Sequence, residues 1–327
     1  MDDFSSSRPI PQPAEIRAAL RRLVPFIRTT PVLTVPGAEF ELGPAVIVHL
    51  KLEQLQHTGS FKTRGAVNAL IAPVERPHRV IAASGGNHGA AVAWAAQRLG
   101  LAADIFVPSI ASPAKVDRLV SYGAQVHIVG SVYQDALDAS LEFAAATGAR
   151  TIHAYDDPLV VTGAGTVGCE LSDTLGPVDH VVVACGGGGL SGGLAAWFGP
   201  SGPTIHVVET DGTATFRAAL DAGEPVSIDV RGIAADALGA TKLGEVGWRS
   251  LQAAGAKSVL VTDDDVANAR ALLWERFRLL IEPAAAATVA AAINGRIDLT
   301  SRADLRPDQT TSVAIVLCGA NTVLTSS

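Results

Sequence analysis

The chain has 327 residues, more than one hydrophobic core usually supports, so we expect two domains. Apolar residues make up 48% and charged residues 17%, which is typical of a well-packed α/β protein and excludes a disordered chain. The formal net charge is −7 and lysine and arginine never cluster beyond two in a row, so we expect neither nucleic acid nor an anionic membrane as a partner.

The cysteines and the N-terminus indicate the compartment. Cys169, Cys185 and Cys318 are odd in number and far apart, so we expect neither a disulfide framework nor a zinc site. Residues 1–13 lack the basic-then-apolar layout of a signal peptide, and no apolar stretch approaches the roughly 18 residues of a membrane span. We therefore expect a cytoplasmic protein without a metal site.

Short β-branched runs alternate with helical patterns, which predicts βαβ units and parallel sheets. An apolar strand over residues 45–51 comes first and is followed by a helix over 65–71. Four further strands alternate with three helices in the next part of the chain: strands 79–83, 104–108, 125–129 and 151–154, and helices 88–99, 113–122 and 133–147. These elements predict a compact α/β unit with a four-stranded sheet.

A second set of buried strands follows, over residues 180–184, 204–209, 257–262 and 312–318, with helices over 264–279 and 283–293. Asp263 or Asp264 is predicted to cap the first of these helices. Strand 45–51 belongs with this larger sheet, so the smaller unit is predicted to be inserted into the larger one. We expect a large domain over 1–77 and 158–327 and a small domain over 78–157.

Lys62 stands between the strand and the helix, beside Phe61 and among small and hydroxylated residues. Partial desolvation at such a position lowers the pKa of lysine, and only the neutral amine attacks a carbonyl. This is the environment that a Schiff-base lysine needs. Most lysines at strand ends are solvated surface charges, so the motif on its own does not decide the matter.

Two glycine-rich turns follow predicted strands. The turn Ser84-Gly85-Gly86-Asn87-His88 precedes a helix, and its backbone N–H groups can bind a carboxylate; a plain tight turn is the alternative. The turn after residue 184 contains consecutive glycines, Gly186, Gly187, Gly188 and Gly189, followed by Leu190. Each glycine costs about 0.5–1 kcal/mol in regular structure, and a nest of N–H donors for a phosphate compensates for this. No Gly-Lys-Ser/Thr follows, so this is no Walker loop, and a flexible loop is the alternative.

Cys318 ends the last apolar strand and is either a small buried hydrophobe or a weak partner for a ring nitrogen. Together, the lysine, the phosphate nest, the anion-binding turn and this neutral side chain point to pyridoxal 5′-phosphate. The aldehyde of that cofactor would meet Lys62, its phosphate the glycine loop and its pyridine nitrogen Cys318.

From about residue 31 to residue 321 the chain resembles the serine/threonine dehydratases of the fold-type II pyridoxal-phosphate enzymes. The motifs that carry the resemblance are Thr-Gly-Ser-Phe-Lys62-x-Arg-Gly-Ala, Ala-Ser-Gly-Gly-Asn87-His88, Gly186-Gly-Gly-Gly-Leu190, Glu282-Pro-Ala-Ala-Ala and Leu-Cys318-Gly-Ala-Asn321. The resemblance implies two α/β domains with twisted, mostly parallel sheets, as in the tryptophan synthase β fold.

The resemblance also implies roles. Lys62 forms the Schiff base and then acts as the general base at Cα, while Phe61 packs beside the cofactor ring. Asn87 binds the ring hydroxyl, and Cys318 faces the ring nitrogen. The substrate carboxylate is implied to bind Ser84, Gly86, Asn87 and His88, and the phosphate to bind Gly186, Gly187, Gly188, Gly189 and Leu190. Glu282 is implied to lie near the ring; a carboxylate at a helix start is the alternative.

The implied reaction is elimination. A neutral thiol beside the ring nitrogen leaves the ring a weaker electron sink than a carboxylate would, which favours loss of a β-hydroxyl in step with Cα deprotonation. The resemblance therefore implies that a cytoplasmic homodimer converts L-threonine or L-serine to a 2-oxo acid and ammonia.

Departures from the family pattern bear on the alternatives. Gly85 stands where serine racemases place an acid on the second face of Cα, and racemisation needs a group on both faces. Thr63 stands where β-replacement synthases carry an acidic residue. Glu209 matches the family's cation site, but Thr215 stands where its second acid belongs. A serine or aspartate racemase, a 3-hydroxyaspartate dehydratase and a non-catalytic cofactor-binding protein remain as alternatives.

Overall fold

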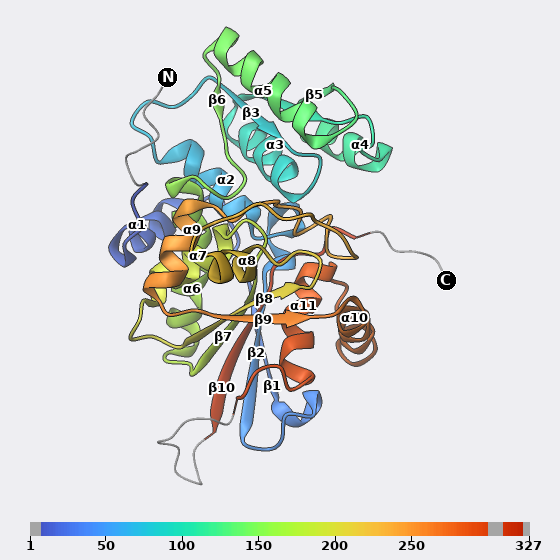
Figure 1. Ribbon diagram of the computed structural model, residues 1–327. Helices are drawn as coiled ribbons and strands as arrows, with labels where there is room; N and C mark the ends of the chain where they lie inside the picture. Colours follow the sequence, from blue (N-terminus) through green and yellow to red (C-terminus); the bar gives the residue numbers. More distant parts are fainter. Residues whose placement is uncertain (1–7, 300–309, 323–327) are drawn as a thin grey trace.

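The computed structural model describes residues 8–299 and 310–322, which form two sheets flanked by helices (Figure 1). The six-stranded sheet has the order β1-β2-β10-β7-β8-β9, and the four-stranded sheet has the order β5-β4-β3-β6. Neighbouring strands run parallel except β1 and β2, which are antiparallel. The predicted α/β fold with two mostly parallel sheets is confirmed.

The strands of the larger sheet come from both ends of the chain, and those of the smaller sheet come from one continuous stretch. The larger sheet contains β1 (Val32–Pro36), β2 (Val46–Leu52), β7 (His180–Ala184), β8 (Thr204–Thr210), β9 (Lys257–Val261) and β10 (Thr311–Leu317). The smaller sheet contains β3 (Arg79–Ala83), β4 (Ala102–Val107), β5 (Gln125–Ile128) and β6 (Arg150–Thr151). Every residue of β7 is buried, as expected of a central parallel strand.

Helices cover both sheets. Those nearer the smaller sheet are α2 (Lys62–Ile71), α3 (Asn87–Leu99), α4 (Pro113–Ser121) and α5 (Tyr133–Thr147). The others are α1 (Pro13–Leu23), α6 (Pro158–Leu175), α7 (Gly189–Phe198), α8 (Thr215–Ala222), α9 (Glu245–Ala253), α10 (Asp263–Phe277) and α11 (Pro283–Ile293). Among the described residues, no helix is long and apolar enough to cross a membrane.

The two largest hydrophobic clusters do not divide at one point of the chain. The larger core surrounds the six-stranded sheet. The core of the smaller sheet includes Leu70 of α2 and Val160 of α6 as well as Val80 and Ile105 of its own strands. All four strands of the smaller sheet lie within residues 79–151, but its core extends beyond them. The boundaries at 77/78 and 157/158 therefore stay a prediction.

Three local predictions change. The N-cap of α10 is Thr262, whose hydroxyl accepts a hydrogen bond from the N–H of Asp265 at 3.1 Å, so the predicted caps at Asp263 and Asp264 are wrong. Helix α2 begins at Lys62 and not at residue 65. Strand β6 ends at Thr151, because the next residues turn back and His153 Nδ1 accepts from the N–H of Asp156 at 2.9 Å.

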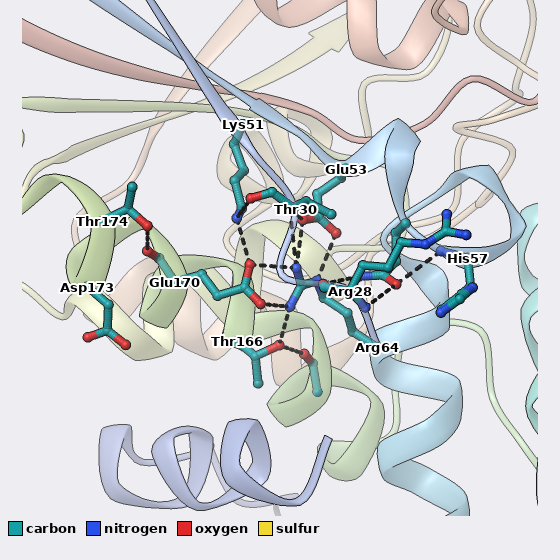
Figure 2. A network of polar contacts seen from close by, with 12 residues as sticks. Arg28, Thr30, Lys51, Glu53, His57, Arg64, Thr166, Glu170, Asp173 and Thr174 are labelled. Atoms are coloured by element: carbon teal, nitrogen blue, oxygen red, sulfur yellow. Dashed lines mark hydrogen bonds and ion pairs between the residues drawn. The ribbon is translucent and has the colours of Figure 1, made fainter. Parts of the chain in front are cut away.

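A network of buried charges joins β2, α2 and α6 beside the start of α2 (Figure 2). Arg64 donates to Glu53 at 2.8 Å through Nε and to Glu170 at 2.8 Å through Nη1. Lys51 Nζ donates to Glu170 at 2.6 Å and to the carbonyl oxygen of Thr30 at 2.8 Å. The side chains of Lys51, Glu53 and Arg64 have no exposed surface. We define these four side chains, Lys51, Glu53, Arg64 and Glu170, as the ionic quartet.

Candidate active site

One cavity lies where β7 and β10 end and where α2, α3, α7 and α11 begin. Every residue for which the sequence predicted a cofactor contact lines it: Phe61, Lys62, Asn87, Gly186, Gly187, Gly188, Gly189, Leu190, Glu282 and Cys318. Sequence reasoning missed five further lining residues, Tyr155, Ala184, Ala237, Leu238 and Ala284. Four of the five are small or apolar side chains, which carry no chemical signal in a sequence, and only the folded chain brings all five to the cavity.

Lys62 is the first residue of α2, and its side chain is partly buried. Its Nζ donates to the carbonyl oxygen of Ala154 at 2.8 Å and makes no ion pair with any described carboxylate. Burial lowers the pKa of Lys62 to about 8, although the nearby Cys318 and Glu282 act in the opposite direction. A lysine with this pKa carries a far larger fraction of neutral amine near pH 7 than a solvated lysine does.

Backbone contacts hold Cys318 next to this lysine. The N–H of Phe61 donates to the carbonyl oxygen of Cys318 at 3.0 Å, and Ser60 and Gly319 form an isolated β-bridge. Cys318 is buried, and burial raises the pKa of its thiol above the ordinary value. The group therefore remains a neutral S–H.

The glycine loop, residues 186–189, lines the cavity, and no side chain of its own covers its backbone. A Cβ at Gly187 would lie 2.2 Å from the ring of Tyr155, and a Cβ at Gly186 would lie 3.1 Å from Leu238. Gly188 has φ +84°, which disfavours any residue with a Cβ. Helix α7 begins at Gly189, so the loop leads to first-turn N–H groups that have no partner within the helix. This geometry suits a phosphate.

Glu282 directs its side chain into the site although it occupies the N-cap position of α11. It forms no capping bond to that helix. Its carboxylate accepts from Asn87 Nδ2 at 3.0 and 3.1 Å and from the N–H of Asn321 at 3.2 Å. Cys318 Sγ lies 3.8 Å from Glu282 Oε1, and burial raises the pKa of Glu282. Glu282 thus stands at a helix start, but its carboxylate contacts residues of the site and not the first turn of α11, and its role near the ring stays a prediction.

The predicted carboxylate turn lies at the start of α3. The N–H of Gly86 donates to Ser84 Oγ at 3.3 Å. His88 Nε2 contacts the carbonyl oxygen of Ile152 at 2.8 Å, and burial lowers the pKa of His88 to about 3. Because the imidazole is neutral and this nitrogen donates to a carbonyl, His88 holds the turn through its side chain and can offer an anion only its backbone N–H.

Glu209 and Thr215 lie behind the glycine loop. Glu209 accepts from the N–H groups of Phe216 and Arg217 at 2.7 and 3.0 Å and from the hydroxyl of Thr215 at 3.1 Å. The same hydroxyl also contacts the carbonyl oxygen of Gly186. Glu209 thus binds the start of α8 and, through Thr215, supports the glycine loop. Within residues 8–299 and 310–322, no three His, Cys, Asp or Glu side chains are grouped so as to hold a metal ion.

Comparisons with known proteins agree with this geometry. The family described as "Pyridoxal-phosphate dependent enzyme" matches residues 23–319. The chain belongs to this family. L-Threonine ammonia-lyase of Thermotoga maritima is 34% identical over 84% of this chain and 67% of its own length. Phenylserine dehydratase of Ralstonia pickettii is 33% identical over 96% of this chain and 94% of its own length. The structure of maize serine racemase superposes with a TM-score of 0.87 at 27% identity over 97% of this chain and 95% of its own.

This pyridoxal-phosphate enzyme has a cavity that fits its cofactor. Asn87 lines the cavity, and its Oδ1 is buried and has no partner among the described residues, as expected of an acceptor for a ring hydroxyl. The glycine loop lines the same cavity and leads into the first turn of α7, whose N–H groups suit a phosphate. Lys62 would hold the aldehyde carbon, Asn87 the ring hydroxyl, and residues 186–190 the phosphate.

Proposed function

We propose that the protein catalyses β-elimination of water from L-threonine or L-serine, which yields a 2-oxo acid and ammonia. The observation that carries this proposal is Lys62, a partly buried lysine with a pKa near 8 in a cavity that adjoins the anion-binding start of α3. When bound, pyridoxal phosphate supplies an electron-withdrawing ring that acidifies the Cα–H of an amino acid.

The side chains then have separate tasks. The neutral amine of Lys62 takes the proton from Cα, and the N–H groups at the start of α3 orient the substrate carboxylate. The neutral thiol of Cys318 would not keep a proton on the ring nitrogen as a carboxylate would, which favours loss of the β-hydroxyl in step with removal of the Cα proton. The hydroxyl takes up one proton, equivalent to the one that Lys62 removed from Cα, and leaves as water; a water molecule then hydrolyses the released enamine to the 2-oxo acid and ammonia.

Racemisation is the second candidate, and the similarity to serine racemase supports keeping it. It requires an acid on the second face of Cα, and Gly85 offers no side chain there. Elimination needs only one base, so we favour it. A 3-hydroxyaspartate dehydratase and a non-catalytic cofactor-binding protein remain as lesser alternatives. The similarity to enzymes named for threonine and for phenylserine leaves the β-substituent open.

We also propose that the protein is a cytoplasmic homodimer. The three cysteines are buried and unbridged, which fits a reducing compartment. Light scattering of the purified holoprotein tests the dimer, and a mass equal to one chain of 33.6 kDa would contradict it.

The test is release of 2-oxo acid from L-threonine and L-serine by holoprotein, with Lys62→Ala beside it. We expect the variant to lose about 10²–10⁴-fold in turnover, because the base at Cα is gone. The exposed Lys257→Ala is the matched control and keeps wild-type turnover. Equal turnover in Lys62→Ala would reject the lysine assignment. Cofactor binding without release from either substrate would reject elimination and leave racemisation or a non-catalytic role.

A further inference from the structure

A second cavity of about 210 Å³ adjoins the cofactor cavity. Asn87, Ala237 and Glu282 line both cavities, so the two are contiguous at these residues. The second cavity extends from there towards the first turn of α4, and Gly85 and Gly86 of the carboxylate turn also line it. A substrate whose carboxylate binds this turn therefore has its β-carbon within reach of the second cavity.

The small residues of this cavity leave room for a bulky group. Its wall contains Gly85, Gly86, Ala114, Ala237 and Ala320. A Cβ at Gly86 would meet no atom within 4 Å. A buried apolar cavity of about 150 Å³ is enough to bind benzene, so a space of 210 Å³ accommodates a phenyl ring. The methyl group of threonine would leave most of it unfilled.

The charged residues of the cavity are already paired with protein groups. Lys115 forms an ion pair with Asp236, and this pair joins α4 to the loop that carries Ala237. Arg118 donates to Asn321 Oδ1 and to the carbonyl oxygen of Thr58. Among the residues that the structure describes, both cations of the lining therefore already donate to protein oxygens, and a second substrate carboxylate would have to displace one of these partners.

We propose that this cavity is the subsite for the β-substituent of the substrate and that it accepts an aromatic ring, so that the enzyme acts on β-aryl-β-hydroxy amino acids. This inference rests on the proposed elimination for its reaction but not for its binding. The ring would lie between the carboxylate turn and the first turn of α4, with Ala114 and Ala320 beside it.

Binding of unreactive amino acids to the holoprotein tests the subsite without any elimination. L-Phenylalanine carries the phenyl ring but no β-hydroxyl, and L-alanine lacks both. By calorimetry we expect L-phenylalanine to bind at least about tenfold more tightly than L-alanine, because a phenyl ring leaves water. The companion measurement is kcat/KM for β-phenylserine and for L-threonine.

Ala114→Leu narrows the subsite from an exposed position of α4, where leucine is a good helix former. We expect it to remove the preference for L-phenylalanine and to lower the ratio of kcat/KM for β-phenylserine over L-threonine at least about tenfold. Ala145→Leu, at an exposed position of α5 that does not line the cavity, is the matched control and leaves both ratios unchanged.

The outcomes separate the two proposals. Elimination from L-threonine with no preference for L-phenylalanine would overturn the subsite and leave the proposed function intact. A preference that Ala114→Leu abolishes, without elimination from any substrate, would support the subsite and reject the proposed function. Tighter binding of L-aspartate than of L-phenylalanine would overturn the aromatic assignment in favour of a second carboxylate.

Discussion

Two lysines close in sequence are held in opposite ways. Lys51 belongs to the ionic quartet, where it contacts Glu170 and the carbonyl oxygen of Thr30. Lys62 lines the cofactor cavity, where its Nζ donates to the carbonyl oxygen of Ala154 and lies 5.2 Å from the centroid of the Phe61 ring. Both amines are desolvated, but only the Lys51 ammonium contacts a carboxylate that compensates for the lost hydration.

The comparison shows that burial alone does not make a lysine reactive. A carboxylate in contact stabilises the ammonium and opposes the effect of desolvation, whereas a carbonyl dipole compensates only in part. The quartet also pairs two cations with two anions, and Arg64 within it has a raised pKa through Glu53 and Glu170 despite its burial. The fold therefore stabilises the charged forms of the ionic quartet, whereas it lowers the pKa of Lys62 at the start of α2.

The largest expected effect comes from breaking the quartet. Lys51→Met leaves Glu170 buried with one of its two cationic partners lost, and we expect it to destabilise the protein by about 3 kcal/mol. The measurement is the shift in the urea midpoint. Asp173→Ala, which breaks the exposed pair with Arg17, is the control and costs at most about 1 kcal/mol. If Lys51→Met lowered the free energy of unfolding by a similarly small amount, the buried quartet would contribute no more to stability than an exposed ion pair does.

The same substitution at Lys62 should act in the opposite direction. The pKa of Lys62 is about 8 in the folded protein against 10.5 when solvated, so below pH 8 the folded state carries an unfavourable ammonium. In the cofactor-free protein, Lys62→Met should therefore add up to about 3 kcal/mol of stability at pH 7. The gain should shrink between pH 8 and 10.5 and vanish above that window. Urea midpoints of the wild type and of Lys62→Met at pH 7 and at pH 10.5 measure this gain. A loss of stability in Lys62→Met at pH 7 would contradict the proposed difference between Lys51 and Lys62.

A third prediction concerns space rather than charge. Gly187→Ala would place a Cβ 2.2 Å from the ring of Tyr155, so the ring or the loop has to move. We expect the dissociation constant of the cofactor to rise by roughly 10-fold or more, equivalent to about 1–3 kcal/mol of overpacking. Visible absorbance of the bound cofactor measures it. Adding Tyr155→Ala should recover part of the loss, and additive losses in the double variant would contradict the assigned clash.

The smallest expected effect is a gain. A Cβ at Gly85 would meet Val107 Cγ1 at 3.4 Å and Ala111 Cβ at 3.7 Å, so a serine fits with ordinary contacts. Gly85→Ser should give slow formation of D-serine from L-serine, at a rate well below elimination, because it adds a hydroxyl near the second face of Cα. Chiral chromatography measures it. Rapid racemisation by the unsubstituted protein would show that another residue already supplies that acid.

The sequence predicted the parts of this site in which the residue type itself carries the chemistry. Lys62, Asn87 and the glycine loop each follow a recognisable strand or precede a helix, so their places along the sheets could be inferred. Strand β1 was not predicted, because Pro31 and Pro36 at its ends and its antiparallel pairing break the βαβ pattern. Helix α6 was also not predicted, because its glycines have low helix propensity. The reason for these glycines is visible only in the folded structure, where α2 and α7 approach α6 closely.

The ionic quartet shows why some contacts lie beyond sequence reasoning. Glu170 stands 119 residues from Lys51, and nothing local distinguishes it from a surface carboxylate. Gly163 of α6 explains the proximity, because a Cβ there would lie 2.5 Å from the carbonyl oxygen of Arg64. The contact depends on two helices being pressed together, which is a property of the tertiary packing. The same holds for Ala237, which only the fold brings between the two cavities.

The hydrogen bond from Lys62 to Ala154 has a mechanical consequence. Ala154 lies just after β6, where the chain leaves the smaller sheet, and the bond ties that exit to the first residue of α2. Any electrophile that captures the amine takes away a donor that this carbonyl uses. The chemical state of the Lys62 nitrogen therefore decides whether the segment after β6 keeps this contact with the first residue of α2.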